Sequence, residues 1–183
     1  MKLILLDGGP ASGKNTLGTL LVRKFQNHGD KVILLDLDTY VEQLNPIWTW
    51  NDKNREKNDQ QKARVNFAET IDNYLRQKYI VIAIGERFLT KENIVNFIVR
   101  LKTLPSHICL YHLSVPFQLR TERLDKRGPH SLIDLAKDQK DRNLNPKWYG
   151  YIYKNVNSEE IDAQNLFKLI QNNQGLIDIN MIK

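Results

Sequence analysis

The stretch that decides the fold is Gly8-Gly9-Pro10-Ala11-Ser12-Gly13-Lys14-Asn15-Thr16. It follows the apolar run Leu3-Ile4-Leu5-Leu6 and precedes a segment, 14–27, whose apolar residues recur every three to four positions. The spacing G-x-x-x-x-G-K between a strand and a helix is typical of a loop that wraps phosphate groups. Its glycines let backbone N–H groups turn inward, and the helix N-terminus adds partial positive charge. The stretch therefore predicts ATP binding, with Lys14 as the catalytic cation facing the β- and γ-phosphates.

One position departs from the usual phosphate loop. A Ser or Thr ordinarily follows the lysine and binds Mg²⁺ through its hydroxyl, but here Asn15 stands there, followed by Thr16. An amide oxygen can approach a hard cation directly or through a water molecule. Asn15 is therefore a candidate magnesium ligand.

Short apolar runs alternate with helical patterns along the whole chain, which is typical of a parallel α/β sheet. The predicted strands are 2–7, 31–36, 79–84, 107–113 and 149–154. The predicted helices are 14–27, 60–77, 91–102, 116–126 and 158–172.

Two polar, irregular stretches, 45–59 and 127–145, interrupt this alternation. In an open parallel sheet, ligands sit beyond the carboxyl ends of the strands. We therefore expect one domain over 1–183, with an acceptor-side insertion at about 45–64 and a lid at about 127–145. In the insertion, Trp48 and Trp50 either stack on a ring of the acceptor or pack the insertion onto the core. In the lid, three basic residues alternate with aspartates and are expected to be solvated: Lys137, Lys140 and Arg142.

Two carboxylates follow the second predicted strand, in the sequence Leu35-Asp36-Leu37-Asp38. If the strand continues through them, its alternation places Asp36 and Asp38 on the same face, beside the phosphates. We expect Asp36 to help place Mg²⁺ and Asp38 to orient or deprotonate an acceptor hydroxyl. The alternative is that Asp38 caps a helix that begins near Thr39.

Three arginines lie on or next to the helix predicted at 116–126. Arg120 and Arg123 are three positions apart and share a helical face, with Arg127 one turn further on. A guanidinium group suits the charge that develops on a transferring phosphoryl group, because it offers several donors in a rigid plane. Arg123 and Arg127 are therefore predicted to be catalytic, and a solvated basic face is the alternative.

The bulk composition sets limits on location and partners. The net charge is +6, which favours anionic partners or simply a basic surface. Cys109 is the single cysteine, as suits a reducing compartment. No apolar run approaches the roughly 20 residues that a membrane span requires, so we expect a cytoplasmic protein without a membrane partner. The four histidines have no metal-binding spacing, and none is predicted to be a ligand or a catalyst.

Together, the phosphate loop, the Asp36–Asp38 pair and the arginines after Pro116 resemble the P-loop nucleotide and small-molecule kinases. The resemblance implies a three-layer α/β/α fold with a five-stranded parallel sheet, ATP with Mg²⁺, and an arginine-bearing lid. Arg55 lies in an R-x-x-N element that resembles adenylylsulfate kinase, and Glu86-Arg87 resembles a pair in deoxynucleoside kinases. The resemblance thus adds Arg55 and Arg87 to Asp38 as candidate substrate-binding residues. Shikimate kinase, chloramphenicol phosphotransferase and polynucleotide kinase are similar too, and the subfamily stays open.

These observations favour an ATP-dependent kinase that phosphorylates a small anionic metabolite, a nucleoside or a nucleotide. A nucleic-acid end kinase is the first alternative, because the chain is basic and carries the two tryptophans. A nucleotide-binding regulatory module without turnover is the second. The acceptor and the oligomeric state are not determined at this point.

Overall fold

The computed structural model describes residues 1–46, 53–126, 134–144 and 149–178. Five parallel strands form one sheet in the order β2-β3-β1-β4-β5. Their bounds are β1 Lys2–Gly8, β2 Val32–Asp36, β3 Ile80–Ile84, β4 His107–Ser114 and β5 Tyr151–Lys154. Each bound lies within two residues of the prediction, so the predicted five-stranded parallel sheet is confirmed.

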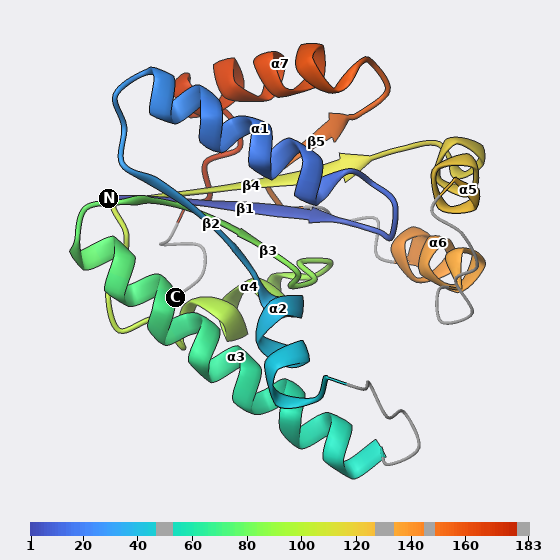
Figure 1. Cartoon of the computed structure of the whole chain (residues 1–183), viewed down its shortest axis with the longest axis horizontal. Helices are drawn as coiled ribbons and strands as arrows, with labels where there is room; N and C mark the ends of the chain where they lie inside the picture. The colour runs from blue at the N-terminus through green and yellow to red at the C-terminus, as the bar shows by residue number, and fades with distance from the viewer. Residues whose placement is uncertain (47–52, 127–133, 145–148, 179–183) are drawn as a thin grey trace.

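Helices cover both faces of the sheet and make the predicted three-layer fold (Figure 1). One face carries α1, Lys14–Asn27, and α7, Glu159–Gln171. The other face carries α2, Leu37–Leu44, α3, Lys53–Arg76, and α4, Lys91–Ile98. Beyond the carboxyl ends of β1 and β4 lie α5, Phe117–Asp125, and α6, Leu135–Leu144 (Figure 1).

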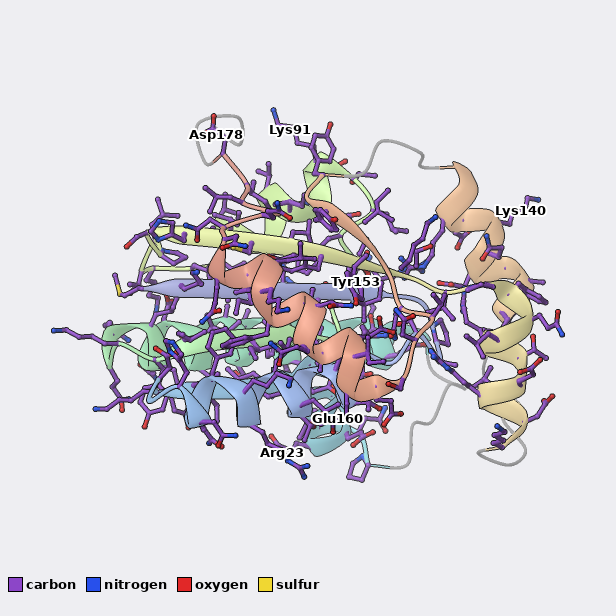
Figure 2. All side chains as sticks on the ribbon, turned by 90° about the horizontal axis from the view of Figure 1, so that it is seen from above. Arg23, Lys91, Lys140, Tyr153, Glu160 and Asp178 are labelled. Atoms are coloured by element: carbon purple, nitrogen blue, oxygen red, sulfur yellow. The ribbon has the colours of Figure 1, made fainter. Side chains whose placement is uncertain are left out.

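The two main hydrophobic cores lie on opposite faces of the sheet, and the central strand β1 contributes side chains to both. Successive side chains of a strand point to opposite faces, and a parallel strand that is covered on both faces is apolar throughout. Leu3 and Leu5 accordingly pack with Phe67 of α3, whereas Ile4 and Leu6 pack with Leu21 of α1. Seen from above, α1 and α7 run side by side across the sheet, and charged side chains such as Lys91 and Lys140 point outward (Figure 2). Within the described residues, no helix is long and apolar enough to span a bilayer.

Three predictions about helices were wrong in part. Helix α3 begins at Lys53 rather than near residue 60, so much of the polar insertion is regular helix. Helix α6 occupies a stretch that lacked apolar periodicity and was predicted to be irregular. Helix α2 begins at Leu37, directly after β2, so Asp38 does not belong to the strand. Trp48 and Trp50 lie outside the described residues.

Candidate nucleotide-binding site

The phosphate loop turns between β1 and α1 through two residues of positive φ, Ala11 at 57° and Gly13 at 87°. Gly13 is the N-cap of α1 and has no side chain, so it leaves the first-turn N–H groups to a ligand. A Cβ atom at Gly13 would lie 2.7 Å from Asn155 Nδ2, and that same nitrogen donates to the carbonyl oxygen of Ser12 at 2.7 Å. Asn155, which follows β5, therefore supports the loop through its contacts with Ser12 and Gly13.

Two features of the loop fit a polyphosphate. The hydroxyl of Ser12 is buried and has no hydrogen-bond partner among the described residues, and an unsatisfied buried group of this kind indicates a missing ligand or water. The ammonium group of Lys14 lies over the loop and donates to the carbonyl oxygens of Gly8, at 2.8 Å, and Gly9, at 3.2 Å. Burial lowers the pKa of Lys14, and the nearby carboxylate of Asp7 opposes that shift.

Asp36 stands at the carboxyl end of β2, where it contacts both α1 and α2. It accepts a hydrogen bond from Asn15 Nδ2 at 2.9 Å and one from the backbone N–H of Asp38 at 3.1 Å. Asp36, not Asp38, is therefore the N-cap of α2. The prediction that strand alternation aligns Asp36 and Asp38 was wrong, because the chain leaves the sheet after Asp36 and turns into a helix.

The metal site predicted at Asn15 and Asp36 has these two side chains in contact with each other. The described residues contain no group of three or more His, Cys, Asp or Glu that could hold a metal ion. Mg²⁺ in kinases is usually held by one or two carboxylates together with water and the phosphates of the substrate. The Asn15–Asp36 pair beside the loop fits that arrangement.

A cavity of about 660 Å³ opens beside the loop. Lys14, Asp38, Glu86 and Arg87 line it, together with Asp138 and Arg142 of α6. Asp38 is exposed toward the opening, but partial burial of its carboxyl group raises its pKa, and the neighbouring Asp36 raises it further. The cavity thus places a carboxylate with a raised pKa near the cation of the loop.

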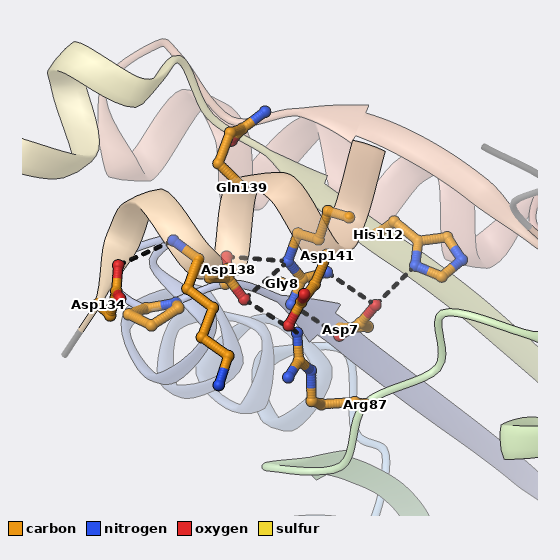
Figure 3. Close-up of polar contacts among 12 residues, drawn as sticks. Asp7, Gly8, Arg87, His112, Asp134, Asp138, Gln139 and Asp141 are labelled. Atoms are coloured by element: carbon orange, nitrogen blue, oxygen red, sulfur yellow. Dashed lines mark hydrogen bonds and ion pairs between the residues drawn. The ribbon is translucent and has the colours of Figure 1, made fainter. Parts of the chain in front are cut away.

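Four side chains form what we call the Asp138 cluster: Asp138, Arg87, Arg120 and Arg142. Figure 3 shows Asp138 and Arg87 of this cluster beside Asp7. The carboxylate of Asp138 lies 2.7 Å from Arg120 Nη2, 3.2 Å from Arg87 Nη2 and 3.2 Å from Arg142 Nε. The cluster sits directly on the phosphate loop, since a Cβ atom at Gly9 would lie 2.3 Å from Asp138 Oδ2. The prediction that Arg142 is solvated was wrong, because only 11% of its side chain is exposed. Lys137 and Lys140 are exposed, as predicted.

Of the arginines singled out in the sequence, Arg120 and Arg123 both contact the phosphate loop. Arg120 is buried and donates to the carbonyl oxygen of Pro10 at 2.9 Å, so it is not part of a solvated face. Arg123 reaches the carbonyl oxygen of Ala11 at 3.4 Å and lines a second cavity, of about 250 Å³, on the other side of the loop. Arg127 lies outside the described residues, as does the side chain of Arg55.

Sequence reasoning missed three residues that hold this site together, namely Asp7, His112 and Asn155. Asp7 and His112 face each other on β1 and β4, with His112 Nδ1 2.9 Å from Asp7 Oδ2. A charged residue at the end of an apolar strand is a signal for Asp7, because such strands are otherwise apolar. Asn155 carries no comparable signal, since its contact with the loop joins residues 143 positions apart.

Comparisons with known proteins agree with this fold. The family model of chromatin associated protein KTI12 matches residues 1–130. The chain is similar to shikimate kinase from Aquifex aeolicus (18% identity, TM-score 0.61, 94% of this chain and 98% of that one). It is also similar to the tunicamycin resistance protein of Deinococcus radiodurans (12% identity, TM-score 0.62, 97% and 98%). No match was found among curated proteins. At these identities the solved structures show the P-loop kinase-like fold alone, and a P-loop fold implies nucleotide binding.

Proposed function

This chain belongs to the KTI12 family, and we propose that it is an ATP-dependent phosphotransferase. In this proposal one domain over 1–183, with its acceptor-side insertion and lid, transfers the γ-phosphate of ATP to a small anionic metabolite, a nucleoside or a nucleotide. One observation carries the proposal: Lys14 and Asp38 line the same cavity of about 660 Å³ beside the phosphate loop. A cation for the phosphates and a carboxylate for an acceptor hydroxyl are the two groups that such a transfer needs.

The loop and Lys14 would hold the β- and γ-phosphates, because backbone N–H groups and an ammonium group both favour negative charge there. Asp36 and Asn15 would hold Mg²⁺, whose chemistry is to neutralise charge that develops between the β- and γ-phosphates. Arg123 and Arg127 are proposed to cover the transferring group, and Arg55 and Arg87 to bind the acceptor. This mechanism is mostly positioning and electrostatic stabilisation.

Asp38 is proposed to act on the acceptor. Its carboxylate would take the proton of the acceptor hydroxyl while the new O–P bond forms and the bond from the γ-phosphorus to the bridging oxygen breaks, so that ADP leaves. A raised pKa makes Asp38 a better base than an ordinary aspartate, because efficiency grows as the pKa approaches the operating pH.

A regulatory module without turnover is the second candidate. The description of the family as chromatin associated favours it. The net charge of +6 also favours a nucleic acid as a possible acceptor, because nucleic acids are polyanions. A cytoplasmic location stays a prediction.

The test is a panel of metabolites, nucleosides and oligonucleotides assayed for acceptor-stimulated release of ADP. We expect one class to stimulate release and Lys14→Ala to abolish most of it. Lys24→Ala is the matched control, because Lys24 lies on the same helix but pairs with Gln164, away from the loop. Tight ATP binding with no stimulation by any acceptor would favour the regulatory module.

A further inference from the structure

Asp7 is a charged residue at a buried position of the central strand β1, where an apolar side chain is expected. It precedes Gly8 at the end of β1, after four residues that are fully buried, and only 1% of its own side chain is exposed. A buried carboxylate is costly unless charged partners and hydrogen bonds compensate for the lost water. Within the phosphate loop, the charge of Asp7 acts on Lys14, whose lowered pKa it opposes. The hydrogen bonds of Asp7 go to other elements, and these partners indicate a second role.

Those partners come from two other elements. His112 of β4 contacts one carboxylate oxygen, while its other ring nitrogen lies 2.5 Å from the carbonyl oxygen of Tyr149, which fixes the ring. From α6, Arg142 places Nη1 3.3 Å from Asp7 Oδ2 and Nη2 3.5 Å from Oδ1. Burial would raise the pKa of Asp7, but the hydrogen bond with His112 and the charge of Arg142 outweigh it and hold that pKa below its usual value.

The contacts continue from Arg142 back to the phosphate loop, and Figure 3 shows Asp7, His112 and Asp138, which take part in them. Arg142 Nε lies 3.2 Å from Asp138, Asp138 lies 2.7 Å from Arg120, and Arg120 donates to the carbonyl oxygen of Pro10. These contacts form a closed path that runs from β1 through α6 and α5 to the loop. Asp7 is the point at which that path is attached to the sheet.

Helix α6 depends on this path because it has little apolar surface to bury. Among its described side chains, Leu135 alone belongs to a hydrophobic cluster, with Ala11 and Leu124. Apolar contact at one end of a helix does not set how the helix lies along its length. The ion pairs of Asp138 and Arg142, which lie one and two turns after Leu135, are therefore what places α6 over the loop.

We propose that Asp7 is a positioning residue that, through Arg142, holds α6 and the Asp138 cluster over the phosphate loop. The proposal rests on the proposed function for its effect on turnover, but not for the placement of α6. A planar guanidinium held by two carboxylates, Asp7 and Asp138, has a fixed orientation, which a lysine in its place would not have.

The test is a double-mutant cycle of Asp7→Asn and Arg142→Gln. We expect Asp7→Asn to lower kcat on the order of 10-fold to 100-fold, the effect of displacing positioned groups by about 1 Å, with a smaller change in the KM for ATP. In the Arg142→Gln background, Asp7→Asn should change kcat by less than about twofold, because the two residues act as a unit. An equal loss in both backgrounds, or no loss in either, would overturn the proposal.

Hydrogen exchange of the α6 amides, without nucleotide, tests the placement separately from turnover. Asp7→Asn should speed exchange over residues 135–142, whereas Asp72→Asn should not. Asp72 is the matched control, since it is also a buried carboxylate that accepts two hydrogen bonds, but its donors are the backbone N–H groups of Lys102 and Thr103, which precede the amino end of β4. If wild type proves inactive, unchanged exchange in Asp7→Asn still refutes the proposal that Asp7 holds α6 in place. Should Asp7→Asn not fold, Arg142→Lys tests the same contact, because it keeps the charge and removes the planar fork.

Discussion

At the scale of single residues, Asp36 and Asp38 show how two close carboxylates acquire different properties. Asp36 accepts hydrogen bonds from Asn15 and from the start of α2, which fixes its orientation. Asp38 faces the cavity with a raised pKa. Environments that separate two carboxylates in this way often mark different roles in a reaction.

Asp38→Asn should separate activity from stability. We expect turnover to fall by roughly 10²–10⁴-fold, as for a positioned acid–base group. Stability at pH 7 should not fall, because a pKa that is raised in the folded state means that the ionised carboxylate disfavours folding. Any gain in stability from Asp38→Asn should disappear as the pH falls below 3.8, the ordinary pKa of an aspartate.

The measurements for this variant are ADP release and thermal unfolding at several pH values. Glu42→Gln is the control, because it removes one exposed charge from the next turn of the same helix. It should change turnover far less, since Glu42 is the smallest of the causes that shift the pKa of Asp38. Near-normal turnover in Asp38→Asn would move the catalytic carboxylate to Asp36 or Glu86.

Asp7 should have the opposite effect on stability, because its ionised carboxylate favours the folded state. Its pKa is lowered in the folded state, so its contribution to stability is complete above the unfolded value, near 3.8, and is lost as the pH falls through the lowered value. Chemical denaturation of wild type and Asp7→Asn should therefore differ most at neutral pH, and the difference should shrink below about pH 4. A difference that stays constant down to pH 3 would show that the carboxylate is not held by His112 and Arg142 as described.

At the scale of elements, the helices that bury an apolar face were predicted more accurately than those that do not. Helix α1 was predicted with its observed bounds, because Leu17, Leu21 and Phe25 face the sheet at helical spacing. The first turns of α3 and the whole of α6 lack such a stripe, so periodicity cannot detect them. Helix α2 was misplaced because Asp36 ends a strand and caps a helix at the same residue.

The same physical reason limits prediction of the site. The phosphate loop is local in sequence, and its lysine, glycines and strand–helix context could all be recognised. The Asp138 cluster joins residues from β3–α4, α5 and α6, as far as 51 positions apart, through charge pairs that leave no periodic pattern. Only the fold reveals which of the alternating charges of α6 face inward.

Gly9→Ala should displace α6 while leaving the fold intact. Gly9, unlike Gly13, does not have a positive φ, so its backbone accepts an alanine. The added Cβ atom would lie 2.3 Å from Asp138 Oδ2 and 2.5 Å from Arg120 Nη2, both at the ends of side chains that can move aside. We expect turnover to fall by about 10-fold, with the melting temperature lowered by only a few degrees.

Turnover and melting of this variant are to be compared with those of Gly29→Asn. Gly29 has open space around it and a φ of 88°, which asparagine tolerates, so this control replaces a glycine far from the loop. Unchanged turnover in Gly9→Ala would mean that the contact between Asp138 and the loop has no part in the reaction.

At the scale of the whole molecule, the phosphate loop lies between two cavities. The smaller is lined by Arg123 and Asn155, and the larger by Asp38, Arg87, Asp138 and Arg142. The larger cavity is lined by residues of the loop, α1, α2 and α6, and the smaller one by residues of the loop, α1, α5 and α7. A nucleotide in the loop would therefore contact elements from every layer of the fold.

ATP should consequently stabilise the whole chain rather than a single loop. A ligand that binds only the folded state adds RT ln(1 + [L]/Kd), about 2.7 kcal/mol at 100 times the Kd. For a chain of this length, each kcal/mol raises the melting temperature by about 2–4 °C, so saturating ATP should raise it by roughly 5–10 °C. Lys14→Ala should lose most of this shift, because the variant lacks the cation that faces the β- and γ-phosphates.

Thermal denaturation of wild type, Lys14→Ala and Lys24→Ala, each with and without ATP and Mg²⁺, checks this expectation. Lys24→Ala should keep the full shift, since Lys24 pairs with Gln164 on the far end of α1. If Asp36 and Asn15 hold Mg²⁺, the shift should be larger with the metal than without it, and Asp36→Asn should lessen that difference. An equal shift in Lys14→Ala and wild type would place the nucleotide outside the phosphate loop, and the assignment of both cavities would then fail with it.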